Sequence, residues 1–255
     1  MGNEKEMKIQ FIGTGAADHE WSRYGEPGVM GSTVTLLDDH ILIDCGPTAL
    51  CALERYQADI DKITDIVITH SHTDHFDREN LKAVCTGRKL RLWGSGNVCG
   101  KAAEFCETRV LHYGMKFRIG RYDFLALEAN HAVEDPTEET FLYLISGEKT
   151  LLYALDTGYL SSKAHRLLGK TRIDGAVWDA TMSEPGDWRL FDHTDGRMFN
   201  IQRGLLERTG NMTPDTKVWF SHRARTLWPQ ELELQRKITE RENVLLAIEG
   251  ETVYL

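Results

Sequence analysis

Four potential metal ligands follow one another directly after a single apolar segment of this chain. Residues 66–69 read IVIT and residues 70–75 read HSHTDH. In a tight loop, alternate side chains can converge on one cation while the next pair turns toward a second, and imidazole with carboxylate suits zinc, iron or manganese. This pattern predicts a buried strand that ends at a metal site. The candidate ligands are His70, His72, Asp74 and His75.

The rest of the chain alternates β-rich runs with helical stretches and shows no break in composition. We therefore predict one domain over residues 1–255, an α/β fold of the αββα kind, in which two mixed sheets pack face to face with helices outside. Strands are expected near residues 8–12, 33–37, 41–44, 65–69, 109–113, 122–128, 140–145, 150–155, 173–178, 217–220 and 243–254, and helices near 47–56, 77–85, 96–106, 161–168, 196–208 and 229–239.

Composition narrows the class of protein. A chain of 255 residues with 41% hydrophobic content can bury a substantial core without a disulfide or a metal staple. The first eight residues are charged and contain no apolar stretch, so we expect no export signal and no lipid anchor. No apolar run approaches the roughly 20 residues that cross a bilayer. We therefore expect a cytoplasmic protein without a membrane partner.

Charge and cysteine content exclude further classes. The five cysteines are odd in number and form no CxxC pair, which suits reduced thiols better than a disulfide framework or a thiolate zinc site. The net charge of −9 argues against a stable nucleic-acid partner, because sequence-independent affinity comes mostly from neutralised phosphates. An anionic substrate must then be small or meet local positive charge, which bound divalent cations would supply.

The spacing of residues 70–75 resembles the HxHxDH motif of the metallo-β-lactamase superfamily, and the resemblance extends over nearly the whole chain. It implies the metallo-β-lactamase fold and three more ligands, each just after a predicted strand: His131, Asp156 and His222. The resemblance also implies two metal ions, zinc or manganese or else iron, with a hydroxide between them. One ion would have His70, His72, His131 and Asp156, and the other Asp74, His75, Asp156 and His222.

Alternatives to a metal site are a solvated His-rich turn and later histidines that are ordinary satisfied residues. The set as a whole favours the metal site, because each member ends a predicted strand and the order matches the superfamily. His19, His40, His112 and His165 lack this context and are expected to be structural or surface residues. By the same resemblance, Asp44 at the end of an apolar strand would support the ligand loop from behind.

The segment after residue 176 indicates which reaction, among those of the superfamily, this chain would catalyse. Residues 177–181 and 191–195 resemble its phosphodiesterase branch, including the cyclic-phosphate phosphodiesterases of the carbon–phosphorus lyase pathway. The resemblance implies that His193 faces the substrate phosphate as a general acid or as a cationic contact. The alternative is a loop residue at a helix start. Asp179 would support the site from a strand end, and Asp192 or Asp195 could orient His193 or cap the helix.

Other residues are weaker candidates for substrate contacts. Arg223 and Arg225 follow the last predicted ligand, and guanidinium groups match phosphate by paired hydrogen bonds, although arginines after a strand are more often solvated. Residues 18–31 and 181–195 are irregular stretches that contain aromatic residues, Trp21, Tyr24, Trp188 and Phe191, and are therefore candidate pocket walls. Residues 16–33 contain no cysteine, whereas the phosphodiesterases of the carbon–phosphorus lyase pathway hold a structural zinc in that region.

We therefore predict a metal-dependent hydrolase, with His193 and Asp74 as catalytic residues, that acts on small or cyclic phosphodiesters. A lactonase or thioesterase would use the same metals without His193. A tRNA 3′-processing endonuclease would share the ligands, but no basic Gly/Pro-rich arm is visible in the sequence. A metal-bound sensor without catalysis is a fourth alternative. Superfamily phosphodiesterases often pair, so a homodimer is compatible with the resemblance.

Overall fold

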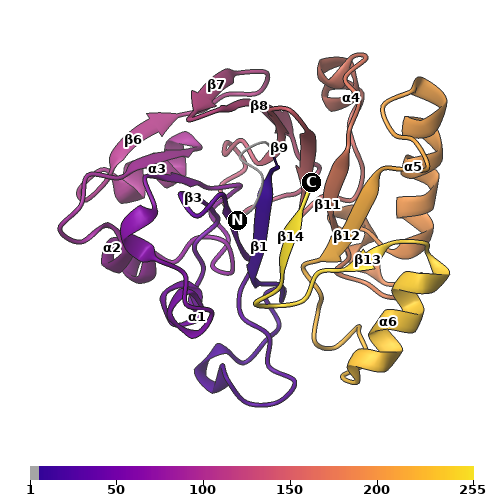
Figure 1. The fold of residues 1–255 in the computed structure, drawn as a ribbon, viewed down its shortest axis with the longest axis horizontal. Coiled ribbons are helices and arrows are strands. Elements are labelled where there is room, and N and C mark those ends of the chain that lie inside the picture. The colour runs from indigo at the N-terminus through magenta and orange to yellow at the C-terminus, as the bar shows by residue number, and fades with distance from the viewer. Residues whose placement is uncertain (1–5) are drawn as a thin grey trace.

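The computed structural model describes residues 6–255, which form two seven-stranded mixed β-sheets with helices along their outer sides (Figure 1). The predicted αββα architecture is confirmed. Residues 1–5, on which the expectations about an export signal and a lipid anchor chiefly rest, lie outside the described residues. Among residues 6–255, no helix is both long enough and apolar enough to span a membrane.

The first sheet combines antiparallel and parallel strands in the order β14-β1-β2-β3-β4-β5-β6. Strands β14, β1, β2 and β3 pair antiparallel, and β3 to β6 pair parallel. The first and last strands of the chain thus lie side by side. Their bounds are β1 Lys8–Gly13, β2 Val34–Leu37, β3 Ile41–Ile43, β4 Asp65–Val67, β5 Arg91–Gly94, β6 Glu107–Val110 and β14 Thr252–Tyr254.

The second sheet has the order β13-β12-β11-β10-β9-β8-β7. Its strands pair antiparallel from β7 to β10 and parallel from β10 to β13. Strands β8, β10, β11 and β12 consequently run in one direction and end at the same edge of the sheet. The bounds are β7 Lys116–Ile119, β8 Tyr122–Glu128, β9 Phe141–Ser146, β10 Thr150–Ala154, β11 Gly175–Asp179, β12 Lys217–Ser221 and β13 Leu245–Leu246.

Helices cover the outer face of each sheet and leave a shared core between the sheets (Figure 1). Apolar residues of α1, α2 and α3 pack on the first sheet, and those of α4 and α5 pack on the second. A third cluster of buried residues joins the facing sides of both sheets. The helices are α1 Ala49–Arg55, α2 Arg78–Cys85, α3 Gly96–Ala102, α4 Ser162–Leu168, α5 Gly196–Thr209 and α6 Leu232–Arg241, with short 3-10 turns η1 Trp21–Arg23, η2 Ile60–Lys62 and η3 Trp188–Phe191.

Three local predictions from the sequence were wrong. Strands β5 and β7 were missed, and the strand expected at 109–113 is β6, which lies at 107–110. These strands are only four residues long, and β6 is exposed at the edge of its sheet, so hydrophobic periodicity barely marks them. The strands expected near 243–254 are present as β13 and β14, which belong to different sheets.

Three strands end in an unusual backbone conformation that turns the chain sharply at the site. Asp44, Asp156 and His222 follow β3, β10 and β12 and have φ of 62°, 51° and 58°. Non-glycine residues rarely adopt positive φ, and Asp and His are among those that tolerate it best. Such strained residues cluster at functional sites, where the surrounding structure holds them in place.

Candidate metal centre

The first candidate metal group joins three histidines and one aspartate. The loop after β4 supplies His70 and His72, the loop after β8 supplies His131, and Asp156 follows β10. His72 Nδ1 lies 3.1 Å from His70 Nε2 and 2.9 Å from His131 Nε2, while Asp156 Oδ2 lies 3.2 Å from His70 Nε2. The four ligand atoms therefore converge on one point, as the sequence pattern implied.

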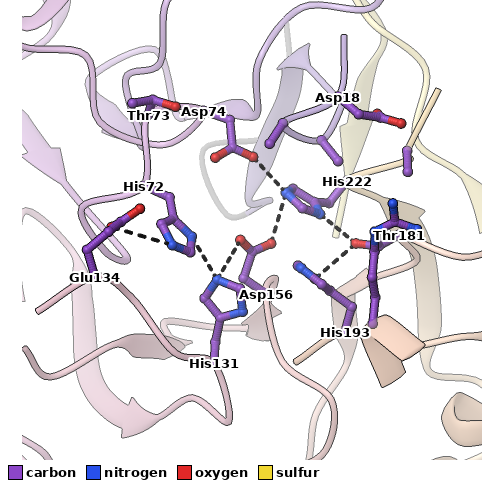
Figure 2. A pocket seen from close by; sticks show the side chains of 14 residues that line it. Asp18, His72, Thr73, Asp74, His131, Glu134, Asp156, Thr181, His193 and His222 are labelled. Carbon is purple, nitrogen blue, oxygen red and sulfur yellow. Dashed lines mark hydrogen bonds and ion pairs between the residues drawn. The ribbon is translucent and has the colours of Figure 1, made fainter. Parts of the chain in front are cut away.

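The second group shares Asp156 with the first and adds residues from both sheets. His222 Nε2 lies 3.0 Å from Asp156 Oδ1 and 3.1 Å from Asp74 Oδ2 (Figure 2). His75 Nε2 lies 3.1 Å from Asp156 Oδ2. Each of the two groups keeps its ligand atoms within 4.8 Å of one another. Asp156 thus stands where a carboxylate can serve both groups.

Two atoms of the second group lack the partners that burial demands. His75 Nε2 and Asp156 Oδ1 are buried, and neither makes a hydrogen bond within residues 6–255. A buried polar atom without a partner is costly, and a bound cation supplies the missing interaction. Imidazole nitrogens with carboxylate oxygens suit zinc, manganese or iron. The residues present therefore fit a divalent metal centre.

Electrostatics within the cluster point to the same conclusion. Burial alone would lower the pKa of His222, but Asp156 and Asp74 outweigh it and raise that pKa to about 10. The same balance raises the pKa of His75 well above its ordinary value. In the first group, which lacks Asp74, burial lowers the pKa of His70 to about 4 and that of His131 to about 3. The carboxylates therefore create a negative field that favours positive charge in the second group.

Asp44 and Thr69 hold the ligand loop from behind. The Thr69 amide and hydroxyl donate to Asp44 Oδ1 at 2.8 and 2.9 Å, and His75 Nδ1 lies 2.8 Å from Asp44 Oδ2. His70 Nδ1 lies 3.0 Å from Thr69 Oγ1. Protons on these Nδ1 atoms leave both Nε2 atoms free to bind a cation, which is the usual role of such supporting groups. The structure places Asp44 where the sequence predicted.

Asp179 and Thr181 support histidines from the second sheet, as Asp44 and Thr69 do from the first. The Thr181 amide donates to Asp179 Oδ1, and Thr181 Oγ1 lies 2.8 Å from His222 Nδ1 and 3.0 Å from His193 Nδ1. His193 Nδ1 also lies 2.8 Å from Asp179 Oδ2. Asp179 is fully buried at the end of β11. It orients His193, whereas Asp195 caps α5 through the Met198 amide.

A cavity of about 330 Å³ opens above the metal groups. His193 lies at its side, with its ring 5.4 Å from that of His222 and 4.9 Å from that of His131 (Figure 2). Burial alone would lower the pKa of His193, but the Asp179 carboxylate outweighs it and raises that pKa. A histidine that is not part of either ligand group therefore faces the cavity in a state that favours its protonated form.

The two arginines expected near the substrate lie elsewhere. Arg223 is only 3% exposed, and its guanidinium donates to the Ala247 carbonyl at 2.7 Å and to Thr14 Oγ1 at 2.8 Å. Burial lowers its pKa to about 10. Arg225 Nε donates to the backbone oxygen of Asp18, and the side chain does not line the cavity. Each arginine holds neighbouring loops together, and neither lines the cavity. The structure therefore gives both a structural role in place of the predicted substrate contact.

Several residues around the site were not singled out from the sequence. Thr69 and Thr181 support the histidines, and Arg189 lines the cavity. Glu138 accepts hydrogen bonds from Ser71 Oγ, between two ligands, and from two residues at the start of α3. A threonine at a strand end, close in sequence to a candidate ligand or an aspartate, is the only local signal, and it is a common one. Arg189 lies inside a stretch predicted as a pocket wall, which is a weak signal.

Comparison with known families decides the wider assignment. A family model described as a beta-lactamase superfamily domain matches residues 39–222, which contain all seven candidate ligands. The chain belongs to the metallo-β-lactamase superfamily. As a member it is a metal-dependent hydrolase, and its histidine and aspartate groups fit the divalent metal ions of such enzymes. No curated protein matches the sequence significantly.

Solved structures share this superfamily fold at low sequence identity. The metallo-beta-lactamase fold protein YhfI from Bacillus subtilis is 16% identical with a TM-score of 0.74, and the match covers 98% of this chain and 100% of that one. A diphosphatase from the PhnP family is 16% identical with a TM-score of 0.71 over 98% and 97% of the chains. The short form of human tRNase Z is 16% identical with a TM-score of 0.66 over 96% and 98%.

Proposed function

We propose that this superfamily member hydrolyses small phosphodiesters, cyclic ones included. The observation that carries the proposal is His193, which belongs to neither of the two ligand groups, faces the cavity and is oriented by Asp179 at 2.8 Å. A lactone or thioester hydrolase needs no such histidine, because its leaving group departs more readily. An alkoxide leaving a phosphodiester needs a proton.

The two ligand groups would hold two divalent cations, zinc or manganese, with Asp156 between them. When bound, such cations lower the pKa of water between them and offset charge on phosphate oxygens. Asp74 contributes its carboxylate to the second group and keeps His222 in place through the 3.1 Å contact. The bound cations would thus present local positive charge to an anionic substrate on an otherwise acidic chain.

His193 is suited to protonate the leaving oxygen. Nδ1 is engaged by Asp179 and Thr181, so Nε2 is the ring nitrogen that remains for a substrate in the cavity. The carboxylate behind the ring fixes its orientation and favours the imidazolium, which is the arrangement of a general acid oriented by a buried aspartate. The raised pKa keeps the acid form available near neutral pH.

The test compares two leaving groups in the metal-loaded wild type and in His193→Ala. A cyclic or dialkyl phosphodiester releases an alkoxide, whereas bis-p-nitrophenyl phosphate releases a stable phenolate. Loss of the acid should lower kcat/KM for the alkyl ester by roughly 100- to 10,000-fold and for the aryl ester distinctly less. Metal content should be unchanged, since His193 belongs to neither of the two groups that would hold the ions.

Asp179→Asn adds a second readout, because removing the carboxylate should lower the pKa of His193. The basic limb of the pH–rate profile would then move to lower pH for the alkyl ester. Equal losses for both esters in His193→Ala would make the residue a phosphate contact rather than an acid. Wild-type enzyme that cleaves lactones, thioesters or nitrocefin but no phosphodiester would overturn the proposed function.

A further inference from the structure

Arg189 is the only lysine or arginine among the residues that line the cavity above the metal groups. It lies in η3, close in sequence to His193. The other charged side chains of the lining, histidines aside, are acidic: Asp18, Asp74, Glu134 and Asp156. Asp74 and Asp156 would be neutralised by the cations, so Arg189 adds a permanent positive charge to the cavity wall beside the proposed acid His193.

The Arg189 guanidinium is oriented by its neighbours, and some of its hydrogen-bond donors remain available to a ligand. Arg189 Nη1 donates to Asp187 Oδ2 at 2.9 Å, and its planar group lies 5.4 Å from the centre of the Trp188 ring. Arg189 Nε and Nη2 make no hydrogen bond within residues 6–255, and the side chain is 32% exposed. Nε and Nη2 of one guanidinium form the edge that binds carboxylate or phosphate through two parallel hydrogen bonds.

Backbone contacts fix η3 to the reacting part of the site. The Arg189 carbonyl accepts from the His193 amide at 2.8 Å, and the Phe191 carbonyl accepts from Asn130 Nδ2 at 2.7 Å. His131 Nδ1 lies 3.3 Å from the Asp192 carbonyl. A segment held at three points to a ligand loop and to the proposed acid keeps Arg189 at a set place relative to the metal groups.

Two acidic side chains of the cavity lining, Glu134 and Asp18, disfavour a second negative group beside them. Glu134 is largely exposed and approaches His72 Nε2 at 3.8 Å. Asp18 is ionised in place, because the Thr226 hydroxyl and the Thr226 and Arg225 amides overcome burial and lower its pKa. A second anionic group of a substrate would therefore be repelled by Glu134 and Asp18 and attracted by Arg189.

We propose that Arg189 binds a second anionic group, a carboxylate or a phosphate, of a substrate whose phosphodiester lies at the metal groups. The preferred substrates are then small phosphodiesters that carry one further negative charge. This inference rests on the proposed function and adds the substrate class. Trp188 and Phe191, both strongly exposed on the same turn, are not needed for it.

The experiment uses two nearly isosteric esters, propyl p-nitrophenyl phosphate and 2-carboxyethyl p-nitrophenyl phosphate, with a 2-phosphoethyl ester as the phosphate counterpart. Wild-type enzyme should prefer the charged esters in kcat/KM by roughly 10- to 100-fold, the range of a hydrogen bond between charged groups. Arg189→Gln should remove this preference, with a far larger loss of kcat/KM for the charged esters than for the propyl ester. Arg208→Gln, which removes an exposed charge at the far end of α5, is the matched control and should retain the preference.

Binding provides a readout apart from turnover. Calorimetric titration with 3-phosphonopropionate should give tighter binding than propylphosphonate in the wild type and equal binding in Arg189→Gln. Equal use of propyl and charged esters by the wild type, or equal losses for all esters in Arg189→Gln, would overturn the inference while the proposed function stands. Absence of hydrolysis of every ester in the wild type would instead overturn the proposed function. If the wild type prefers only the phosphate ester or only the carboxylate ester over the propyl ester, that result identifies the second anionic group.

Discussion

Replacement of Asp44 by asparagine should weaken metal binding without unfolding the protein. Asparagine keeps an oxygen that can accept from the Thr69 amide and hydroxyl, now 2.8 and 2.9 Å from Asp44 Oδ1. It also tolerates the positive φ of 62° at this position. The new amide NH₂, however, replaces the oxygen that lies 2.8 Å from His75 Nδ1. Two N–H groups cannot share that contact, so His75 must move its proton to Nε2, which then cannot bind a cation.

The expected loss is roughly 10- to 100-fold in metal affinity, the range for removal of a group that supports a ligand, or about 1.4 to 2.7 kcal/mol. It should fall mainly on the ion held by His75, because His70 keeps its own contact with Thr69. Competition with a zinc chelator, fitted with two sites at fixed pH, measures it. Asp44→Ala is the contrasting variant, since it also deprives the buried Thr69 amide of an acceptor.

Denaturant unfolding of the metal-free proteins separates the two effects. Asp44→Ala should lose roughly 2–5 kcal/mol in free energy of unfolding, from an unpaired buried amide and from alanine in a left-handed conformation. Asp44→Asn should lose less than Asp44→Ala, because its hydrogen bonds to Thr69 remain. Unchanged affinity for both ions in Asp44→Asn would refute the reasoning, since the contact with His75 would then have no influence on the ligand.

Two further predictions concern the same centre. Asp156→Asn should bind less metal and lose nearly all hydrolysis, because a neutral amide cannot balance two divalent charges; two ions per chain by elemental analysis with near-normal turnover would exclude the shared role. Glu138→Gln should lower affinity for the ion held by His70 and His72 by about tenfold, because Glu138 anchors Ser71 between them at 2.6 Å. Chelator competition measures this loss, and Glu148→Gln on an exposed turn, expected to bind like wild type, is the control.

The sequence was sufficient for the class of fold and for a set of candidate ligands that the structure brings close together. Residues 70–75 place four ligands within one loop, so their convergence is a local property of the chain. The later ligands follow apolar runs that the periodicity identifies as strands. Once strands β8, β10 and β12 run in the same direction, their ends must meet at one edge of the sheet. Chain direction and strand periodicity are both visible in sequence patterns.

The supporting residues were only partly predictable. Asp44 and Asp179 could be proposed because a buried carboxylate at a strand end requires partners. The identity of those partners could not be proposed, since Thr69 and Thr181 look like any threonine beside a strand. The Thr69 hydroxyl lies against its sequence neighbour His70, whereas folding places the Thr181 hydroxyl against His222, which is 41 residues away.

The roles of the arginines were decided by tertiary structure alone. Arg223 follows a ligand directly, yet its guanidinium is buried between Thr14 and Ala247, which lie 209 and 24 residues away in the sequence. Arg189 shows no motif, yet the attachment of η3 to the loop of His131 brings it into the cavity. A long flexible side chain can reach in many directions from one backbone position. The direction of such a side chain is set by packing between distant segments, which local sequence does not encode. The candidate metal ligands instead lie in one short loop and at strand ends, which local sequence does encode.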